Sequence, residues 1–281
     1  MSDRIKHRHV MTFGSIAEAA AKAQEVARYA HKVALQDRSC GGLSFNGAVS
    51  AASNPPRELA ERVARMVDKI EAEAPSTHGA THWAPSVFGG FVSVPDYLAG
   101  EPECMRVREY HKDAFAPVHI ITDSSHCWKV SSETMERRGA AIAALSLRLA
   151  SYRPTRVSVC GIGGARKSKT RNFARGHAGI VAIDVDLQSI DIGSASYLIA
   201  HPAASRRILF PLKCALLECP DEYEPGPRFS PPEVFEALKA EFSQGDQVKV
   251  HFIPSLDDDY FPTGTALERW INTQLEKIGA E

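Results

Sequence analysis

The amino-acid sequence predicts an α/β protein with a doubly wound, mostly parallel sheet in residues 116–281, preceded by a helical and loop-rich region in residues 1–115. From residue 118 onwards, apolar runs of strand length alternate with long amphipathic segments, which is typical of a parallel sheet covered by helices. The chain has 281 residues, enough for one large domain or two small ones. Hydrophobic residues make up 44% of it and charged residues 24%, which is sufficient for a sizeable core.

The N-terminal region is expected to contain two helices. The segment 15–36 begins with Ser15 and Glu18 at the spacing of a capping box and continues with alanine-rich, helix-forming sequence. A second helix is expected over 55–74, where two prolines open the segment and apolar residues recur at helical spacing. Residues 75–117 combine prolines, glycines and short apolar pieces, so they are predicted to form loops with short strands.

The sheet region contains four predicted strands and four predicted helices. The strands are expected at 118–122, 156–162, 178–187 and 248–256, and the helices at 131–152, 189–210, 233–242 and 265–279. The helix over 189–210 is expected to break at Pro202, because a proline inside a helix removes a backbone hydrogen bond. The second and third strands follow each other without a helix between them, so we expect an antiparallel pair at an edge of the sheet.

This layout resembles the von Willebrand factor A fold, in which one antiparallel edge strand joins an otherwise parallel, doubly wound sheet. That family carries a metal-ion-dependent adhesion site with the pattern Asp-x-Ser-x-Ser after its first strand. Asp123 and Ser125 match the first two positions, whereas Cys127 stands at the third. The resemblance implies that a ligand binds beyond the carboxyl ends of the strands, where open α/β sheets have their crevice.

The residues after the first predicted strand are candidates for a Mg²⁺ site. Mg²⁺ prefers oxygen ligands in octahedral order, and the thiol of Cys127 is a poor ligand for it. Asp191 and Asp257 follow later strands and could supply further oxygens. The alternative is that Asp123 and Ser125 only cap a turn or a helix, as Asp and Ser commonly do after a strand. Mg²⁺ is therefore an optional cofactor of the predicted site.

A basic, glycine-bearing segment follows the second predicted strand. Its candidate nucleic-acid-binding residues are Arg166, Lys167, Lys169, Arg171 and Arg175. No acidic residue occurs between 153 and 175, so this loop could bind phosphates of a nucleic acid. The alternative is a solvated hairpin tip. The formal net charge of −1 excludes electrostatic nucleic-acid binding by the molecule as a whole, and only such a local patch could provide it.

Several phrases of the sequence are similar to a family of tailed-bacteriophage proteins. They include "TFGSIAEAAAKAQ" near the N-terminus, "VSVPDYLAGEPECM" before the first predicted strand of the sheet, "DLQSIDIGSASYLIAHPAASRRILF" and the ending "ALERWINTQLEKIG". The similarity follows the same order over most of the chain. It implies a phage or prophage origin and favours the A-like fold, but it implies no particular activity or site residue.

The expected location is the host cytoplasm or the virion. No run of about 18 apolar residues predicts a membrane helix, and the N-terminus lacks the apolar core of a secretory signal. The six cysteines are dispersed, which is typical of reduced thiols and not of a disulfide framework. We therefore expect no membrane contact.

The expected function is non-catalytic binding or assembly. A phage or host protein would bind the strand-end face that carries Asp123, Ser125 and Asp257, and this role is compatible with an oligomer. Two alternatives remain: a nucleic-acid-binding protein that uses the loop 166–175, and a metal-dependent hydrolase that uses Asp123 together with Asp257.

Overall fold

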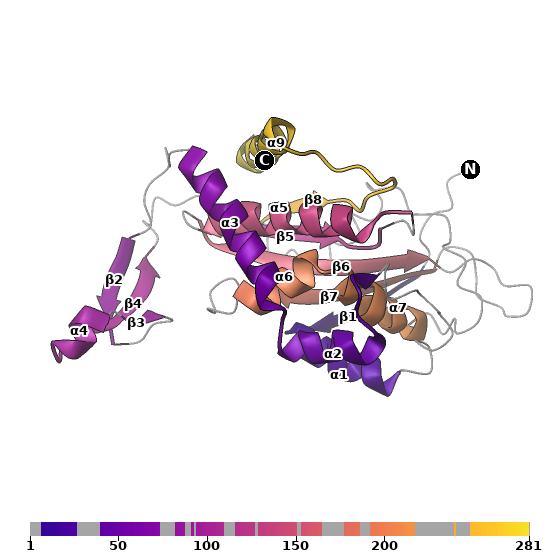
Figure 1. Ribbon diagram of the computed structural model, residues 1–281, viewed down its shortest axis with the longest axis horizontal. Helices are drawn as coiled ribbons and strands as arrows, with labels where there is room; N and C mark the ends of the chain where they lie inside the picture. The colour runs from indigo at the N-terminus through magenta and orange to yellow at the C-terminus, as the bar shows by residue number, and fades with distance from the viewer. Residues whose placement is uncertain are drawn as a thin grey trace, which may run out of the picture.

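The computed structural model describes residues 7–26, 40–73, 82–87, 91–92, 94–109, 116–126, 129–150, 153–164, 177–185, 192–216, 239 and 248–280. In these residues, five strands form one sheet, three strands form a second and smaller sheet, and helices pack on the larger one (Figure 1). Within the same residues, no helix is long and apolar enough to span a membrane.

The larger sheet has the strand order β1, β7, β6, β5, β8. Strand β1 spans His7–Phe13, β5 spans Val118–Asp123, β6 spans Thr155–Gly164, β7 spans His177–Val185 and β8 spans Lys249–Ile253. Neighbouring strands are parallel except β6 and β7, which pair antiparallel as expected. The predicted fold class, an α/β protein whose sheet is mostly parallel with one antiparallel pair, is therefore confirmed.

The sequence pattern does not predict strand β1. This strand pairs parallel with the outer side of β7, so the antiparallel pair lies inside the sheet and not at its edge. Met11 and Phe13 pack with the core under the helices, whereas Val10 packs on the opposite face of the sheet. The alternation that defines a strand is hidden in the sequence, because the strand opens with the polar residues "HRH".

Helices cover one face of the larger sheet. Their bounds are Ile16–Glu25 for α1, Phe45–Ser53 for α2, Arg57–Glu73 for α3, Ser132–Ala150 for α5, Ile192–Ala200 for α6, Phe210–Leu216 for α7 and Thr265–Ala280 for α9. All seven contribute buried residues to one core that includes Ile120, Val159 and Ile183 of the sheet. Alternate strand residues such as Ile121 and Cys160 form a second cluster on the opposite face, as the two-residue period of a strand requires.

The helices largely follow the expected segments. Helix α6 ends at Ala200, and the chain continues after Pro202 through a π-helical segment, η3 (Ala204–Leu209), into α7, so the predicted interruption is present. Helix α1 begins as expected, but residues 27–36 of the predicted helix lie outside the described residues, as does most of the helix expected over 233–242. Helix α2 is not predicted, because two glycines directly precede it.

Helices α5 and α6 are in very close contact at Gly139. A Cβ atom at this position would come within 2.2 Å of the Cα atom of Ala200, so no larger residue fits without moving the backbone. Helix α5 is also joined to α3 by an ion pair between Glu136 and Arg62, with an N–O distance of 2.8 Å. These contacts hold α5 in place and thereby position Arg138, which lies on this helix.

The smaller sheet projects from the main body (Figure 1). Its strands are β2 (His82–Ser86), β3 (Phe91–Val92) and β4 (Met105–Glu109), paired antiparallel in the order β2, β4, β3, and a short helix, α4 (Val94–Leu98), connects β3 to β4. The short strands expected in 75–117 are therefore present. The elements from β1 to α3 share the sheet and core with elements after residue 116, so the main body draws on both sides of the expected boundary.

Candidate functional site

The acidic and hydroxyl residues after β5 lie at the strand end where the sequence places them. Asp123 is the last residue of β5, and its Oδ1 atom accepts a hydrogen bond from the backbone N–H of Ser125 at 2.8 Å. Ser124 is bound to β6, because its backbone N–H and its hydroxyl both donate to the carbonyl oxygen of Cys160, at 2.8 Å and 3.1 Å. Asp123 and Ser124 are buried, with 8% and 5% of their surface exposed.

A buried arginine occupies the gap between the ends of β5 and β8. Arg138 of α5 places its Nη2 atom 2.6 Å from the carbonyl oxygen of Pro254, 3.2 Å from that of Asp123 and 3.3 Å from that of Ile253. The same nitrogen donates to the Thr122 hydroxyl at 3.1 Å. Strand-end carbonyls that would otherwise need water are therefore satisfied from within the protein.

The charge of Arg138 is retained despite its burial. Burial lowers the pKa of Arg138 to about 10, and the nearby Asp123 carboxylate opposes this fall. A group with this pKa is protonated at neutral pH, so the ends of β5 and β8 have a buried positive charge beside them. A hydrogen bond also joins the loops after β5 and β8, since Nδ1 of His126 accepts from the backbone N–H of Leu256 at 3.0 Å.

A buried lysine approaches the same strand end from α7. Lys213 is 5% exposed, and its Nζ atom donates to Ser125 Oγ at 3.2 Å and lies 3.4 Å from the carbonyl oxygen of Ile162. The backbone N–H of Ile162 donates to the same Ser125 Oγ at 2.5 Å. We refer to residues 123–126 together with Arg138 and Lys213 as the strand-end cluster.

The described residues do not fit the predicted Mg²⁺ site. Two nitrogens approach the Ser125 Oγ atom, the backbone N–H of Ile162 at 2.5 Å and Nζ of Lys213 at 3.2 Å, so this oxygen is already engaged within the protein. Among the residues that the structure describes, no group of three His, Cys, Asp or Glu side chains could hold a metal ion. Asp191 lies outside the described residues. The strand-end cluster therefore places the side chains of Arg138 and Lys213 where the resemblance implies a metal.

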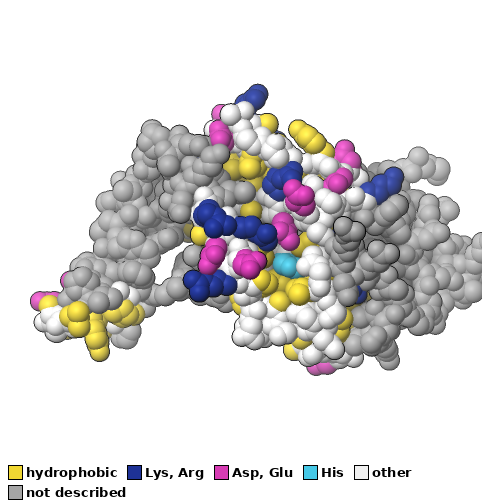
Figure 2. Space-filling view, viewed as in Figure 1, with side chains coloured by type: hydrophobic (Ala, Val, Ile, Leu, Met, Phe, Trp, Pro, Cys, Tyr) yellow, Lys and Arg dark blue, Asp and Glu magenta, His cyan; other side chains and the backbone are white. Residues whose placement is uncertain are grey.

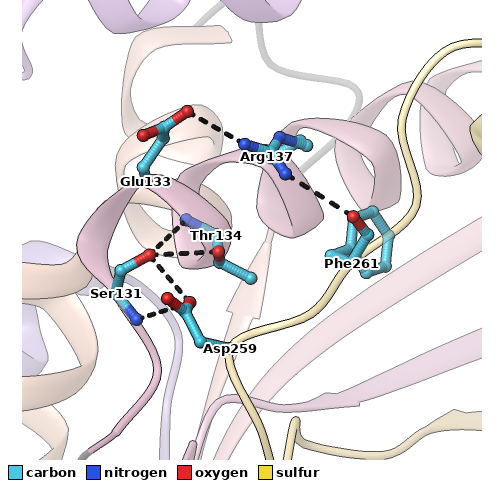
Figure 3. Close-up of polar contacts among 6 residues, drawn as sticks. All are labelled: Ser131, Glu133, Thr134, Arg137, Asp259 and Phe261. Carbon is cyan, nitrogen blue, oxygen red and sulfur yellow. Dashed lines mark hydrogen bonds and ion pairs between the residues drawn. The ribbon is translucent and has the colours of Figure 1, made fainter.

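The acidic triplet after β8 caps a helix. Asp259 Oδ1 accepts hydrogen bonds from both the backbone N–H and the hydroxyl of Ser131, each at 2.8 Å, directly before α5 (Figure 3). Hydrogen bonds from Thr134 and Ser131 lower the pKa of the exposed Asp259 carboxyl. Asp257, the predicted ligand from this loop, is exposed. Negative charge at a helix N-terminus is favourable, so Asp259 ties this loop to α5.

A second polar chain crosses the opposite face of the sheet and is not predicted from the sequence. His119 on β5 lies 2.8 Å from the hydroxyl of Ser158 on β6, which donates to Asp184 Oδ1 on β7 at 2.6 Å. Arg156 forms an ion pair with the second oxygen of Asp184. The serine stands between the histidine and the acid, so this order differs from a nucleophile–histidine–acid triad. Its sequence signal is a set of polar residues at alternate positions of three apolar strands.

The thiol near Asp123 has no nucleophilic character. Burial raises the pKa of Cys160 well above its usual value, and the carboxylates of Asp123 and Asp184 raise it further. Since the thiolate is the reactive form of cysteine, this residue acts as a buried core side chain.

The predicted nucleic-acid-binding residues lie outside the described residues. All five of them, from Arg166 to Arg175, fall between Gly164, where β6 ends, and His177, where β7 begins. The nucleic-acid hypothesis therefore stays a prediction from the sequence.

Comparison with known proteins places the chain in a family. Residues 3–246 match the family described as a domain of unknown function, DUF7192. The chain belongs to this family. No curated protein and no solved structure is significantly similar to it. The matched region contains Ser125, Arg138 and Lys213, whereas Asp259 and α9 follow its end.

Proposed function

We propose that the protein is a phage-encoded binding and assembly protein whose partner contacts the projecting smaller sheet. The contact surface consists of Val87, Val92, Tyr97 and Leu98, which we call the tip. This proposal moves the expected interaction away from the strand-end face, because the groups there are bonded to Arg138 and to one another.

The exposure of large apolar side chains at the tip supports this proposal most directly. The exposed fractions are 57% for Val87, 42% for Val92, 64% for Tyr97 and 78% for Leu98. Figure 2 shows hydrophobic side chains gathered at the end of the projecting unit. Scattered apolar residues on a surface are ordinary, but a group of them on one small unit is typical of an interaction site.

Acidic residues beside the tip indicate the chemistry of the partner. Asp96 lies next to Tyr97 on α4, and the exposed Glu101 and Glu103 follow in the turn that leads to β4. Apolar anchors surrounded by charge are the usual anatomy of a protein interface. We therefore propose a protein partner that offers an apolar pocket with Lys or Arg at its rim, in the infected cell or in the assembling particle.

The proposal is tested by partner recovery from phage-producing cells. Affinity-tagged wild-type protein and the double variant Tyr97→Ser with Leu98→Ser are purified in parallel, and bound proteins are identified by mass spectrometry. Asn272→Ser with Glu276→Ser, two exposed positions on α9, is the matched control. The partner recovered with the wild type and the control should fall at least about 10-fold with the tip variant, since interface energy is concentrated in a few anchors. Equal recovery with all three proteins would contradict the proposal.

A further inference from the structure

The serine at the end of β5 and the buried lysine of α7 have the arrangement of a nucleophile and its base. Lys213 Nζ and Ser125 Oγ are 3.2 Å apart, within hydrogen-bond reach. A third group orients the base, because the carbonyl oxygen of Ile162 lies 3.4 Å from the same Nζ atom. A nucleophile, a base within reach and a group that orients the base define a nucleophilic site.

The lysine side chain is held by its surroundings. A Cβ atom at position 161 would lie 3.2 Å from Lys213 Cδ, so the glycine there leaves room for the lysine stem on the surface of β6. The ring of Phe210 lies on another side, with Nζ 5.6 Å from its centroid. Lys213 is buried, so these contacts surround its side chain beside Ser125.

The serine is accessible, in contrast to its neighbour. Ser125 is partly exposed, whereas Ser124 is buried and donates its hydroxyl to Cys160. The backbone N–H of Ile162 donates to Ser125 Oγ at 2.5 Å, and this bond fixes the position of the oxygen beside Lys213. The turn itself is fixed by the bond from the Ser125 N–H to Asp123.

We propose that Ser125 and Lys213 form a serine–lysine pair that hydrolyses a carboxylic ester or amide. Neutral Lys213 takes the proton of the Ser125 hydroxyl while Oγ bonds to the carbonyl carbon. The bond to the leaving alcohol or amine then breaks, and the leaving group receives that proton. Water attacks the acyl-serine with Lys213 as the base, the Oγ–carbon bond breaks, and the proton returns to Ser125 as the acid is released. Serine–lysine pairs are an established variant of triad chemistry.

This activity goes beyond the proposed binding function and uses a different part of the molecule. A failure of one does not decide the other, because the tip residues and the serine–lysine pair are changed by separate substitutions. The hydrolase considered from the sequence depends on a metal at Asp123, whereas this pair depends on none.

The test is covalent labelling by an alkyl fluorophosphonate, which phosphonylates an activated serine with loss of fluoride. The full-length protein is incubated with the probe, the rate of adduct formation is followed by intact mass, and the labelled residue is found by peptide mapping. We expect one adduct on Ser125. It should be absent in Ser125→Ala and should form at the wild-type rate in Ser53→Ala, which changes an exposed serine at the end of α2.

Two variants of Lys213 distinguish a role as a general base from a role in packing. Lys213→Met keeps the packing of the stem. Lys213→Arg keeps a nitrogen donor at this position but cannot act as a base, because arginine stays protonated in proteins. Both should label at least about 100-fold more slowly, as expected when a general base is lost, while their circular dichroism matches the wild type. No adduct on Ser125 in the wild type, or labelling of Lys213→Arg at the wild-type rate, would overturn the proposal.

Discussion

The strand-end cluster and the tip present opposite kinds of surface. In the strand-end cluster, Asp123, Ser124 and Arg138 are buried. Ser124 is bonded to β6, and Arg138 is bonded to the residues at the ends of β5 and β8. At the tip, Tyr97 and Leu98 expose most of their surface. In a sequence, polar residues after a strand resemble ligand-binding groups. Here most of them form hydrogen bonds within the protein. Apolar residues in a proline- and glycine-rich segment give no such signal in the sequence. In the structure, however, they are the ones that are exposed to solvent.

The largest loss of stability is expected on substitution of Arg138. Arg138→Ala should lower the free energy of unfolding by about 4 kcal/mol, because strand-end carbonyls lose their donor and a buried charge is removed from Asp123. Arg137→Ala is the matched control, since Arg137 mainly pairs with the exposed Glu133, and it should cost no more than about 1 kcal/mol. Urea unfolding measures both. Equal losses for the two variants would show that the strand-end cluster does not depend on Arg138.

A second interior effect depends on pH. Burial, together with the nearby charge of Arg62, lowers the pKa of His201 from its ordinary value of 6.5 to about 4. Above pH 6.5 both states are neutral. As the pH falls towards 4, the unfolded state gains a proton that the folded state does not, so the free energy of unfolding should fall by about 2.5 kcal/mol between pH 7 and 4.5.

The asparagine variant of His201 tests this directly. Nδ1 of His201 accepts a hydrogen bond from the backbone N–H of Ala203 at 3.1 Å, and the amide oxygen of His201→Asn can accept a similar bond. Unfolding titrations at the two pH values should show this pH-dependent loss in the wild type and a much smaller loss in the variant. Identical losses in both proteins would rule out His201 as the cause.

A smaller effect is expected at the cap of α5. The folded pKa of Asp259 is below its ordinary value of 3.8, so its contribution to stability is present above pH 3.8 and is lost as the pH falls below that value. Asp259→Asn should lower the melting temperature at pH 6 and flatten its decline in acid. Asp258→Asn, a neighbouring exposed position, should leave the acid profile of the wild type unchanged, and melting curves from pH 2 to 6 compare the two.

The tip is expected to contribute almost nothing to folding. Leu98→Ser should change the free energy of unfolding by less than about 0.5 kcal/mol, as is usual for exposed positions. Urea unfolding of this variant beside Arg138→Ala sharpens the comparison between the two regions. A loss above about 2 kcal/mol for Leu98→Ser would mean that the tip is packed against something within the protein.

Much of the fold follows from local patterns. The predicted helix start is present, since Ser15 Oγ accepts a hydrogen bond from the Glu18 N–H at 3.2 Å. The Glu18 side chain reaches back to the N–H of Gly14 at 2.8 Å, one residue before the N-cap, and not to the N–H of Ser15 as in a capping box. The apolar runs of β5, β6, β7 and β8 were sufficient to predict the strands and the antiparallel pair. Strand β1 and helix α2 could not be predicted, because polar residues or glycines mask their periodicity and tertiary pairing decides their structure.

Only part of the strand-end cluster could be predicted from the sequence. Asp123 and Ser125 lie at the end of β5 as predicted, but their neighbours Arg138 and Lys213 come from helices 15 and 88 residues away, so no local spacing reveals them. One signal was available. Arg138 lies on the same helical stripe as Leu145, which is fully buried, and a charged residue on a buried stripe indicates a partner inside the protein.

The most direct test of the account is site-specific photo-crosslinking in phage-producing cells. A photoreactive phenylalanine analogue is placed at position 98 of the tip in one protein and at position 257, in the exposed loop beside the strand-end cluster, in another. We expect a discrete adduct with a partner protein from position 98 and none from position 257. An adduct from position 257 with none from position 98 would contradict the account and return the contact surface to the strand ends.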